Sequence, residues 1–196
     1  MFTPGLDRME KKILIIGHMG RQNRNSFHGL GECTIMLDRL DKKILSILQE
    51  DATIPVAEVA KRVGLSTTPC WRRIQKLEED GVILRRVALL DPKSVNTKVT
   101  VFVSIVTNQH SEEWLRRFAE LIREFPEVVE FYRMSGQVDY LLRVVVPDIE
   151  AYDAFYKRLI AKIEISDVSS AFAMEQIKYT TALPLSYIQL DKDKPV

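Results

Sequence analysis

The feature that most constrains the fold of this chain is a short turn, Gly64-Leu65-Ser66, between two amphipathic segments. The segment before it carries apolar residues at helical spacing, and Pro55 stands where a first helical turn tolerates proline. Gly64 can adopt a positive φ without a steric penalty and so ends this helix. Leu65 can then pack inward, and the hydroxyl of Ser66 can cap the following helix. The turn therefore predicts two helices that follow each other closely and pack together.

Two further apolar stripes complete a three-helix pattern. One helix precedes the turn region with Asp38 as its N-cap, and another runs from Thr67 to about Asp80. Their apolar faces are Leu40, Ile44, Ile47 and Leu48 in the first helix and Cys70, Ile74 and Leu77 in the last. The spacing predicts that all three helices share one small core.

Positive charge is concentrated on the last of these helices. The whole chain has a formal net charge of only +1, so it lacks the global electrostatic signature of a nonspecific nucleic-acid binder. Between Ser66 and Leu77, however, Arg72, Arg73 and Lys76 occur without an acidic residue and are predicted to share the outer face. Any affinity for DNA must come from this local cluster.

Two helices joined by a tight turn, the second with a polar start and arginines beyond it, are typical of the helix-turn-helix that reads the major groove. The polar start lies where such a helix approaches base edges and phosphates, and Pro69 would stiffen it. Arg72 and Arg73 can read guanine or clamp phosphate, whereas Lys76 is expected to contact phosphate only. The predicted DNA-binding residues are Ser66, Thr67, Thr68, Pro69, Arg72, Arg73 and Lys76.

Two questions stay open on this helix. Its three cations can be an ordinary solvated helix face instead of a DNA-binding one. Trp71 can pack on the first helix or lie along the DNA backbone, and packing is the interpretation we favour. The combination of spacing, turn and polar start favours DNA binding for the helix as a whole.

The region around the turn resembles the winged helix-turn-helix and linker of the Lrp/AsnC family of bacterial and archaeal regulators. The matching pieces are GLS, RRI, LEEDGVI and LDP, within VAEVAKRVGLSTTPCWRRIQKLEEDGVILRRVALLDPKSV. We expect a strand at Gly81-Val82-Ile83-Leu84 after the last helix. The resemblance implies that the linker from Ile83 to Leu90, ended by Asp91-Pro92, pairs between subunits, so that the unit is a dimer.

The remainder of the chain alternates strand and helix patterns in the order βαββαβ. We expect strands at 99–106, 128–134, 138–146 and 168–179, and helices capped by Ser111 and Asp148. The inward helix faces are predicted to be Leu115, Phe118, Leu121, Ile122 and Phe125, and Tyr152, Phe155, Tyr156, Leu159 and Ile160. This order predicts a ferredoxin-like plan, so the fold class is α+β, a winged helix-turn-helix domain followed by a ferredoxin-like domain. The other sheet face is left uncovered, and symmetric packing of two copies would bury it.

A turn between the second and third of these strands carries the motif Gly136-Gln137-Val138-Asp139-Tyr140. Its order and position resemble the amino-acid-sensing, RAM-type domain of the same family, where a G-x-x-D turn contributes to an effector pocket between subunits or dimers. Asp139 can receive an ammonium group or hold the turn by accepting backbone N–H bonds. A plain hairpin and, for Thr180, a solvated tail are the alternatives. The resemblance implies an effector site made of Ser135, Gly136, Gln137, Val138, Asp139, Tyr140 and Thr180, with Thr181 beside it.

Composition divides the chain further. Most glycines precede residue 36, and residues 1–35 show no sustained period, which predicts a poorly ordered extension. Met36 can be the real initiator, or the extension can be a short arm that touches DNA or a partner through Arg21 and Arg24. The expected divisions are 1–35, a helix-turn-helix domain at 36–83, a strand and linker at 84–97, the ferredoxin-like domain at 98–182 and a C-terminal tail at 183–196.

Composition also argues against several function classes. No apolar run is long enough to span a bilayer, and the first residues lack a signal-peptide layout. Cys33 and Cys70 alone cannot form a disulfide framework or a four-ligand metal site, and only three histidines are present. We therefore expect no cofactor, no metal, no catalytic residue and no membrane partner, in a cytoplasmic, nucleoid-associated protein.

The sequence thus predicts a non-enzymatic, sequence-selective DNA-binding transcriptional regulator whose DNA binding or assembly is modulated by a small effector, an amino acid by the resemblance. The expected partners are double-stranded DNA, the effector and further copies of the chain, as a homodimer that assembles into higher oligomers such as an octamer. One alternative is a sirohaem decarboxylase, a class that resembles this family in fold but is expected to use histidine, of which the second domain has only His110. A metabolite sensor without DNA binding would need a neutralised recognition helix, which Arg72, Arg73 and Lys76 argue against. A chromatin-organising DNA-binding protein remains open.

Overall fold

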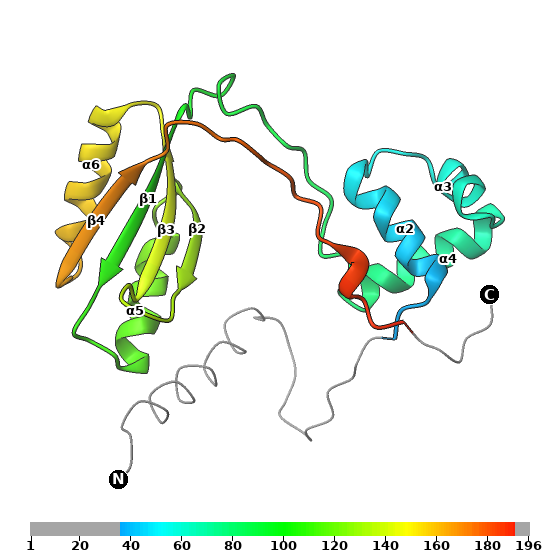
Figure 1. Cartoon of the computed structure of the whole chain (residues 1–196), viewed down its shortest axis with the longest axis horizontal. Coiled ribbons are helices and arrows are strands. Elements are labelled where there is room, and N and C mark those ends of the chain that lie inside the picture. Colours follow the sequence, from blue (N-terminus) through cyan, green and yellow to red (C-terminus); the bar gives the residue numbers. More distant parts are fainter. Residues whose placement is uncertain (1–35, 191–196) are drawn as a thin grey trace, which may run out of the picture. The chain divides into compact units, whose positions relative to one another are not determined.

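The computed structural model describes residues 36–190, and residues 1–35 and 191–196, where the predicted extension and the end of the predicted tail fall, lie outside the described residues. The described chain forms two compact units (Figure 1). Residues 36–89 and 177–190 make a helical unit, and Leu90–Gln176 make a sheet unit. The helical unit is therefore built from two stretches of chain, with the whole sheet unit between them in sequence.

The helical unit contains the three predicted helices, α2 (Arg39–Glu50), α3 (Val56–Val63) and α4 (Thr67–Glu79). α2 begins with a capping box, in which the Asp38 carboxylate accepts the N–H groups of Leu40 and Asp41 while the Asp41 carboxylate accepts the N–H of Asp38. The predicted N-cap is confirmed. The buried core lies between the helices and consists of Ile44, Leu45, Val59, Ala60, Val63, Cys70, Ile74 and Leu77.

The turn between α3 and α4 forms as predicted at Gly64, which has a φ of 78°. Ser66 occupies the N-cap position of α4, but its side chain makes no capping hydrogen bond, so the expected hydroxyl cap is wrong. An N-cap side chain bonds the N–H of the second or third helical residue, and Pro69, the third, has no N–H, so one of these two donors is missing in α4. The backbone N–H groups at the start of α4 thus lack the side-chain acceptor that an ordinary N-cap residue provides.

The end of α4 differs from the prediction. Gly81 has a φ of 73°, and the N–H groups of Val82 and Ile83 both donate to the carbonyl of Leu77 at 2.9 Å. These donors are consumed by the helix end, so the predicted strand at 81–84 does not form. The chain from 84 to 90 has no regular structure, and its apolar side chains are exposed: Leu84, Val87, Leu89 and Leu90.

The C-terminal segment 177–190 is part of the helical unit, which corrects the expectation of a tail from residue 183. The side-chain amide of Gln49 in α2 donates to the Leu183 carbonyl and its oxygen accepts the Leu183 N–H, at 3.2 and 3.0 Å. Leu185 and Ile188, around a short 3-10 helix (Leu185–Tyr187), pack against the helical core. The segment therefore covers part of the apolar surface of the three-helix core.

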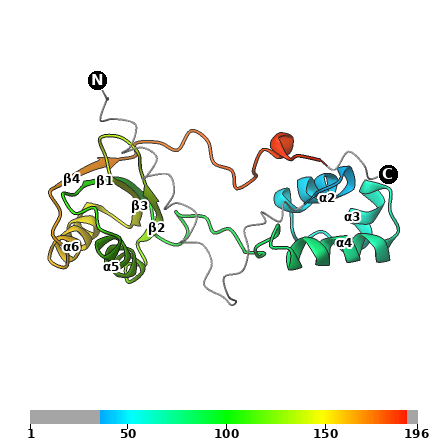
Figure 2. The same cartoon turned by 90° about the horizontal axis from the view of Figure 1, so that it is seen from below.

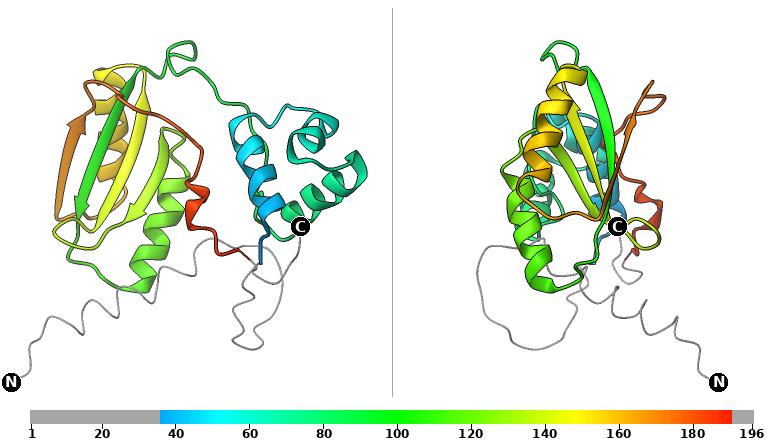
Figure 3. Two further views of the ribbon diagram at one scale, coloured as in Figure 1. Left: turned by 45° about the vertical axis from the view of Figure 1, so that its right-hand side comes forward. Right: turned by 90° about the vertical axis from the view of Figure 1, so that its left-hand side faces the viewer.

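The sheet unit has the predicted ferredoxin-like order. Its elements are β1 (Val99–Val106), α5 (Glu112–Arg123), β2 (Val128–Arg133), β3 (Tyr140–Val146), α6 (Ile149–Ile160) and β4 (Asp167–Phe172). The strands are antiparallel in the order β2-β3-β1-β4, and α5 and α6 lie on one face of the sheet (Figures 2 and 3). Ser111 and Asp148 cap α5 and α6 as predicted, by accepting the N–H groups of Trp114 and Ala151.

Two details of the sheet unit differ from the predictions. The last strand ends at Phe172 and not at residue 179, because its partner β1 begins at Val99 and pairing ends where the Ala173 N–H donates to Thr100. Ile160, predicted to face inward from α6, is exposed at the helix end. Tyr152, Phe155 and Leu159 of the same helix are buried as predicted.

The sheet face away from the helices remains partly apolar. Phe102 in β1 is 39% exposed, and it pairs across with Arg143 of β3, whose guanidinium contacts Glu130 of β2 at 2.6 Å. Tyr132 on the same strand as Glu130 is also exposed. Within the described part of the chain, this face carries no helix.

We predict that the C-terminal segment stabilises the helical unit. Replacing Leu185 and Ile188 by Ala removes apolar contacts with the helical core and should lower the free energy of unfolding of this unit by about 1 to 3 kcal/mol. Hydrogen exchange of the α2 backbone amides across a urea series measures this change. Tyr187→Ala is the matched control, because Tyr187 lies between the two and is 84% exposed. Equal protection in both variants would contradict the prediction.

Candidate functional site

The outer side of α4 presents most of the predicted DNA-binding residues. Their side chains are exposed, while Cys70, Ile74 and Leu77 on the opposite side are buried in the helical core. The exposed set is Ser66, Thr67, Thr68, Pro69, Arg72 and Lys76. α4 has no acidic residue in its first turn, so its positive N-terminal dipole is not offset there.

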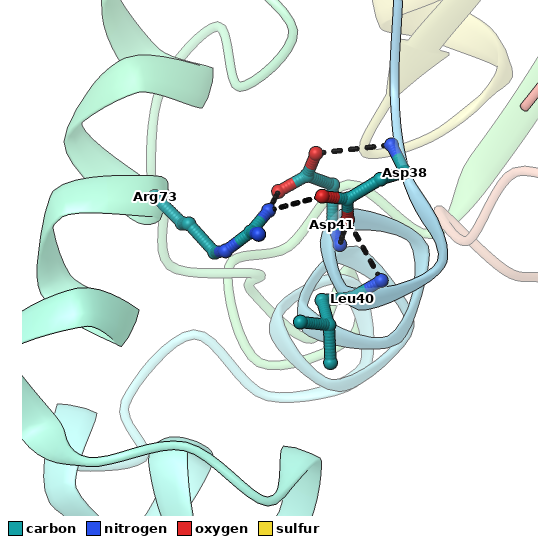
Figure 4. A network of polar contacts seen from close by, with 4 residues as sticks. All are labelled: Asp38, Leu40, Asp41 and Arg73. Carbon is teal, nitrogen blue, oxygen red and sulfur yellow. Dashed lines mark hydrogen bonds and ion pairs between the residues drawn. The ribbon is translucent and has the colours of Figure 1, made fainter. Parts of the chain in front are cut away.

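Arg73 does not belong to this outer face, which corrects the expectation that it lies beside Arg72 and Lys76. One guanidinium nitrogen, Nη1, donates to Asp38 Oδ2 at 2.6 Å and to Asp41 Oδ1 at 2.8 Å (Figure 4). The side chain is 31% exposed, and both carboxylates are largely buried. Arg73 therefore ties the middle of α4 to the first turn of α2.

The charges in this network stabilise one another. Burial disfavours the ionised Asp38, but the N–H of Asp41 and the guanidinium of Arg73 outweigh it and hold the pKa of Asp38 below its ordinary value. Burial likewise opposes the charge of Arg73, and the hydrogen bonds to Asp38 and Asp41 outweigh it and raise the pKa of Arg73. Both shifts favour the charged forms of Asp38 and Arg73. Sequence reasoning missed the network because Arg73 lies in α4 whereas both aspartates lie at the start of α2, 35 and 32 residues away along the chain.

Trp71 lies on the exposed side of α4 with 50% of its surface accessible. A large part of the indole is therefore open to solvent, and the interpretation that the ring packs on the first helix stays a prediction.

The predicted effector turn has a defined backbone. Gly136 has a φ of 128°, a conformation that favours glycine. The Met134 N–H donates to the Asp139 carbonyl, and the Asp139 N–H donates to the carbonyl of Ile105 in β1. Asp139 Oδ2 accepts the N–H of Thr107 at 3.0 Å. Asp139 thus holds the turn against the end of β1, one of the two roles considered for it.

The structure separates the remaining effector candidates. Ser135, Gly136 and Gln137 are exposed at the turn tip, while Val138 is half-buried. Tyr140 is buried in the domain core, where its ring contacts Trp114, Phe118 and Phe131. Thr180 and Thr181 fall in the helical unit, where the Thr180 hydroxyl accepts the N–H of Ala182.

A hollow of about 610 Å³ lies next to the turn, between α5 and β2. It includes Arg133, one of whose terminal nitrogens is buried without a hydrogen-bond partner, but none of residues 135–140. One chain by itself therefore does not enclose the predicted effector residues in this hollow.

The described residues contain no helix long and apolar enough to cross a membrane, and no group of three or more His, Cys, Asp or Glu side chains arranged to hold a metal ion.

Comparison with known proteins assigns each unit to a described family. Residues 37–83 match the winged helix-turn-helix DNA-binding family, and residues 100–183 match the Lrp/AsnC ligand binding domain. The DNA-binding transcriptional activator DecR of Escherichia coli (strain K12) is 52% identical over 151 residues, which are 76% of this chain and 99% of DecR.

Two solved structures are also similar over most of the chain. An AsnC family transcriptional regulator from Agrobacterium tumefaciens is 80% identical with a TM-score of 0.76, covering 78% of this chain and 100% of that one. A transcriptional regulator from Neisseria meningitidis, solved as a complex with L-Met, is 35% identical with a TM-score of 0.74, covering 79% and 100%.

We predict that Arg73 stabilises the helical unit whereas Arg72 does not. Arg73→Met leaves two largely buried carboxylates without their counter-charge and should lower the free energy of unfolding by about 1 to 3 kcal/mol. Arg72→Met, the matched change one residue away on the exposed face, should change it by less than about 0.5 kcal/mol. Urea unfolding followed by far-ultraviolet circular dichroism measures both. A larger loss for Arg72→Met would refute the assignment.

Proposed function

The chain belongs to the Lrp/AsnC family of transcriptional regulators, and on this premise we propose that it binds selected DNA sequences through α4 and regulates transcription in response to a small effector. The observation that carries the proposal is the outer side of α4, where a polar helix start and two cations are exposed together. The third cation, Arg73, is engaged by Asp38 and Asp41. The helix thus has one side for the core and one side for DNA.

We assign separate tasks to the exposed residues of α4. The first turn, with Ser66, Thr67 and Thr68, approaches phosphates and base edges, where unpaired backbone N–H groups favour an anion. Pro69 supports this arrangement, because it removes the donor that a capping Ser66 hydroxyl would use. Arg72, one turn further, is placed to read guanine or clamp phosphate, and Lys76 contacts phosphate.

The effector is proposed to be an amino acid that binds at the turn 135–139. The Neisseria meningitidis regulator, similar over 79% of this chain, was solved with L-Met. In this chain Ser135, Gly136 and Gln137 are exposed at the tip, and Asp139 fixes the turn on β1. Because the hollow between α5 and β2 includes none of the turn residues, we propose that the pocket is completed by a second copy of the chain.

The proposed assembly is a homodimer that associates into higher oligomers, such as an octamer. Two surfaces support it. The linker exposes Leu84, Val87, Leu89 and Leu90, and the sheet exposes Phe102 on the face without helices. A second copy that covered these apolar groups would remove them from water. A dimer would also place two copies of α4 in successive major grooves, roughly 34 Å apart.

The function needs no catalysis, and DecR, the relative described above, is a transcriptional activator. We propose that the protein acts in the cytoplasm on nucleoid DNA.

We predict that removing Arg72 and Lys76 weakens DNA binding in a salt-dependent manner. The double variant Arg72→Ala/Lys76→Ala should bind the DNA upstream of its own gene at least tenfold more weakly than the unaltered protein. The slope of log affinity against log salt should fall by about one for each phosphate that the variant no longer neutralises. Arg116→Ala/Arg117→Ala is the matched control, because it removes two exposed charges from α5 in the sheet unit. Binding is measured by fluorescence anisotropy against upstream and scrambled DNA.

The same titration tests the effector. Repeating it with a pool of amino acids should shift the affinity for upstream DNA in the unaltered protein, with a coupling of about 1 to 3 kcal/mol. Equal and weak binding of all variants to both DNAs would refute sequence-selective regulation. Tight binding to both DNAs, unchanged by amino acids, would favour a chromatin-organising role.

We predict that the exposed linker forms the subunit interface. Leu84→Lys/Val87→Lys introduces charge into a surface that a second copy would cover, and should raise the dimer dissociation constant at least tenfold. Ile149→Lys makes the same kind of change at another exposed apolar residue, outside the proposed interface, and should leave assembly unchanged. Sedimentation velocity over a concentration series distinguishes these outcomes. An unchanged assembly of the linker variant would exclude the linker from the interface.

A further inference from the structure

The indole of Trp71 is an unusual group to leave in water. Tryptophan is among the most buried side chains on average in folded proteins, because its large ring is mostly carbon. Here half of the residue is exposed, on a helix whose neighbouring residue Cys70 is fully buried. The exposed half of the indole therefore leaves a large apolar surface on α4 available to a ligand.

The centre of the helical core is filled by other side chains. Ile44, Val59 and Ile74 are at most 1% exposed. The inward stripe of α4 consists of the buried residues Cys70, Ile74 and Leu77. The accessible half of Trp71 is thus not needed to fill this core.

The position of Trp71 points to the DNA-binding side. It lies one helical turn after Thr67, as Arg72 lies one turn after Thr68, so the four residues form two neighbouring rows on the exposed side of α4. Both rows begin at the start of the helix. In a helix-turn-helix this N-terminal part of the recognition helix is the part that reaches base edges.

We propose that Trp71 recognises the methyl group of a thymine in the major groove and so contributes to the choice of DNA sequence. Among the base edges displayed in that groove, thymine presents an apolar group, its C5 methyl, and the other bases present hydrogen-bond donors and acceptors. An indole has a large carbon surface and a single N–H donor, so it matches a methyl group better than a phosphate. Arg72 beside it carries the charge for the backbone or guanine. This inference rests on the proposed binding of DNA through α4.

The test replaces thymine by uracil, which removes the methyl group alone. Each thymine in the upstream DNA is changed in turn to deoxyuridine, and affinity is measured for the full-length protein and for Trp71→Ala. At one or two positions the unaltered protein should lose roughly fourfold in affinity, the amount expected for one buried methyl group. Trp71→Ala should bind the thymine and uracil forms equally at those positions.

A control separates this contact from binding in general. Arg72→Ala should bind both forms more weakly and keep the difference between them. Circular dichroism checks that Trp71→Ala is folded, as its exposure leads us to expect. The thymine contact is refuted, while the proposed function stands, if the unaltered protein prefers upstream DNA but loses no affinity at any uracil position. It is also refuted if Trp71→Ala lowers the affinity for the thymine and uracil forms by the same factor at every position. No preference for upstream DNA at all would refute both.

Discussion

The contact between Arg73 and the two aspartates at the start of α2 ties α4, the helix that we propose binds DNA, to the rest of the helical unit. A charged pair of this kind adds little net stability, because removing the charges from water offsets much of their attraction. Its value is geometric, since one nitrogen donates to two carboxylates that are themselves fixed by the capping box. The network therefore reinforces the orientation of α4 that its buried side, Cys70, Ile74 and Leu77, already fixes. Arg72 and Lys76 are exposed, whereas Arg73 is engaged by the two aspartates.

The start of α4 lacks the interactions within the chain that usually stabilise the first turn of a helix. A threonine or glutamate in place of Pro69 would supply the N–H that a capping Ser66 hydroxyl accepts, and the isolated helix would be more stable. With Pro69, the hydroxyl makes no capping bond, and no acidic side chain offsets the helix dipole in the first turn. The local sequence thus makes the N-terminal end of α4 less stable, and a phosphate bound at that end would restore the stability. The three-helix core supplies the stability that the helix start lacks.

Local patterns predicted most of the fold and part of the candidate site. Apolar spacing and caps located α2 to α6, because each signal lies within a few residues in sequence. The errors concern partners that lie far away along the chain. Periodicity places Arg72 and Arg73 alike near the surface, and only the position of Asp38, 35 residues earlier, distinguishes them. The strand expected at 81–84 does not form because its backbone N–H groups donate to the Leu77 carbonyl. The tail expected from 183 packs on the helical unit because Leu183 forms hydrogen bonds with Gln49, 134 residues away along the chain.

The division of the helical unit bears on how an effector can act. Within residues 36–190, the sheet unit is inserted between residues 89 and 177 of the helical unit, so this part of the chain connects the two units twice. The second connection leads from β4 directly into the segment that packs on α2, and α2 carries the aspartates that hold Arg73. An effector can change DNA binding only by the difference in its affinity for two states, typically about 1 to 3 kcal/mol. Such a difference is of the same order as the stability that we predict Leu185 and Ile188 to contribute by covering the helical core. The chain that leaves β4 therefore continues into a segment that is itself part of the helical unit.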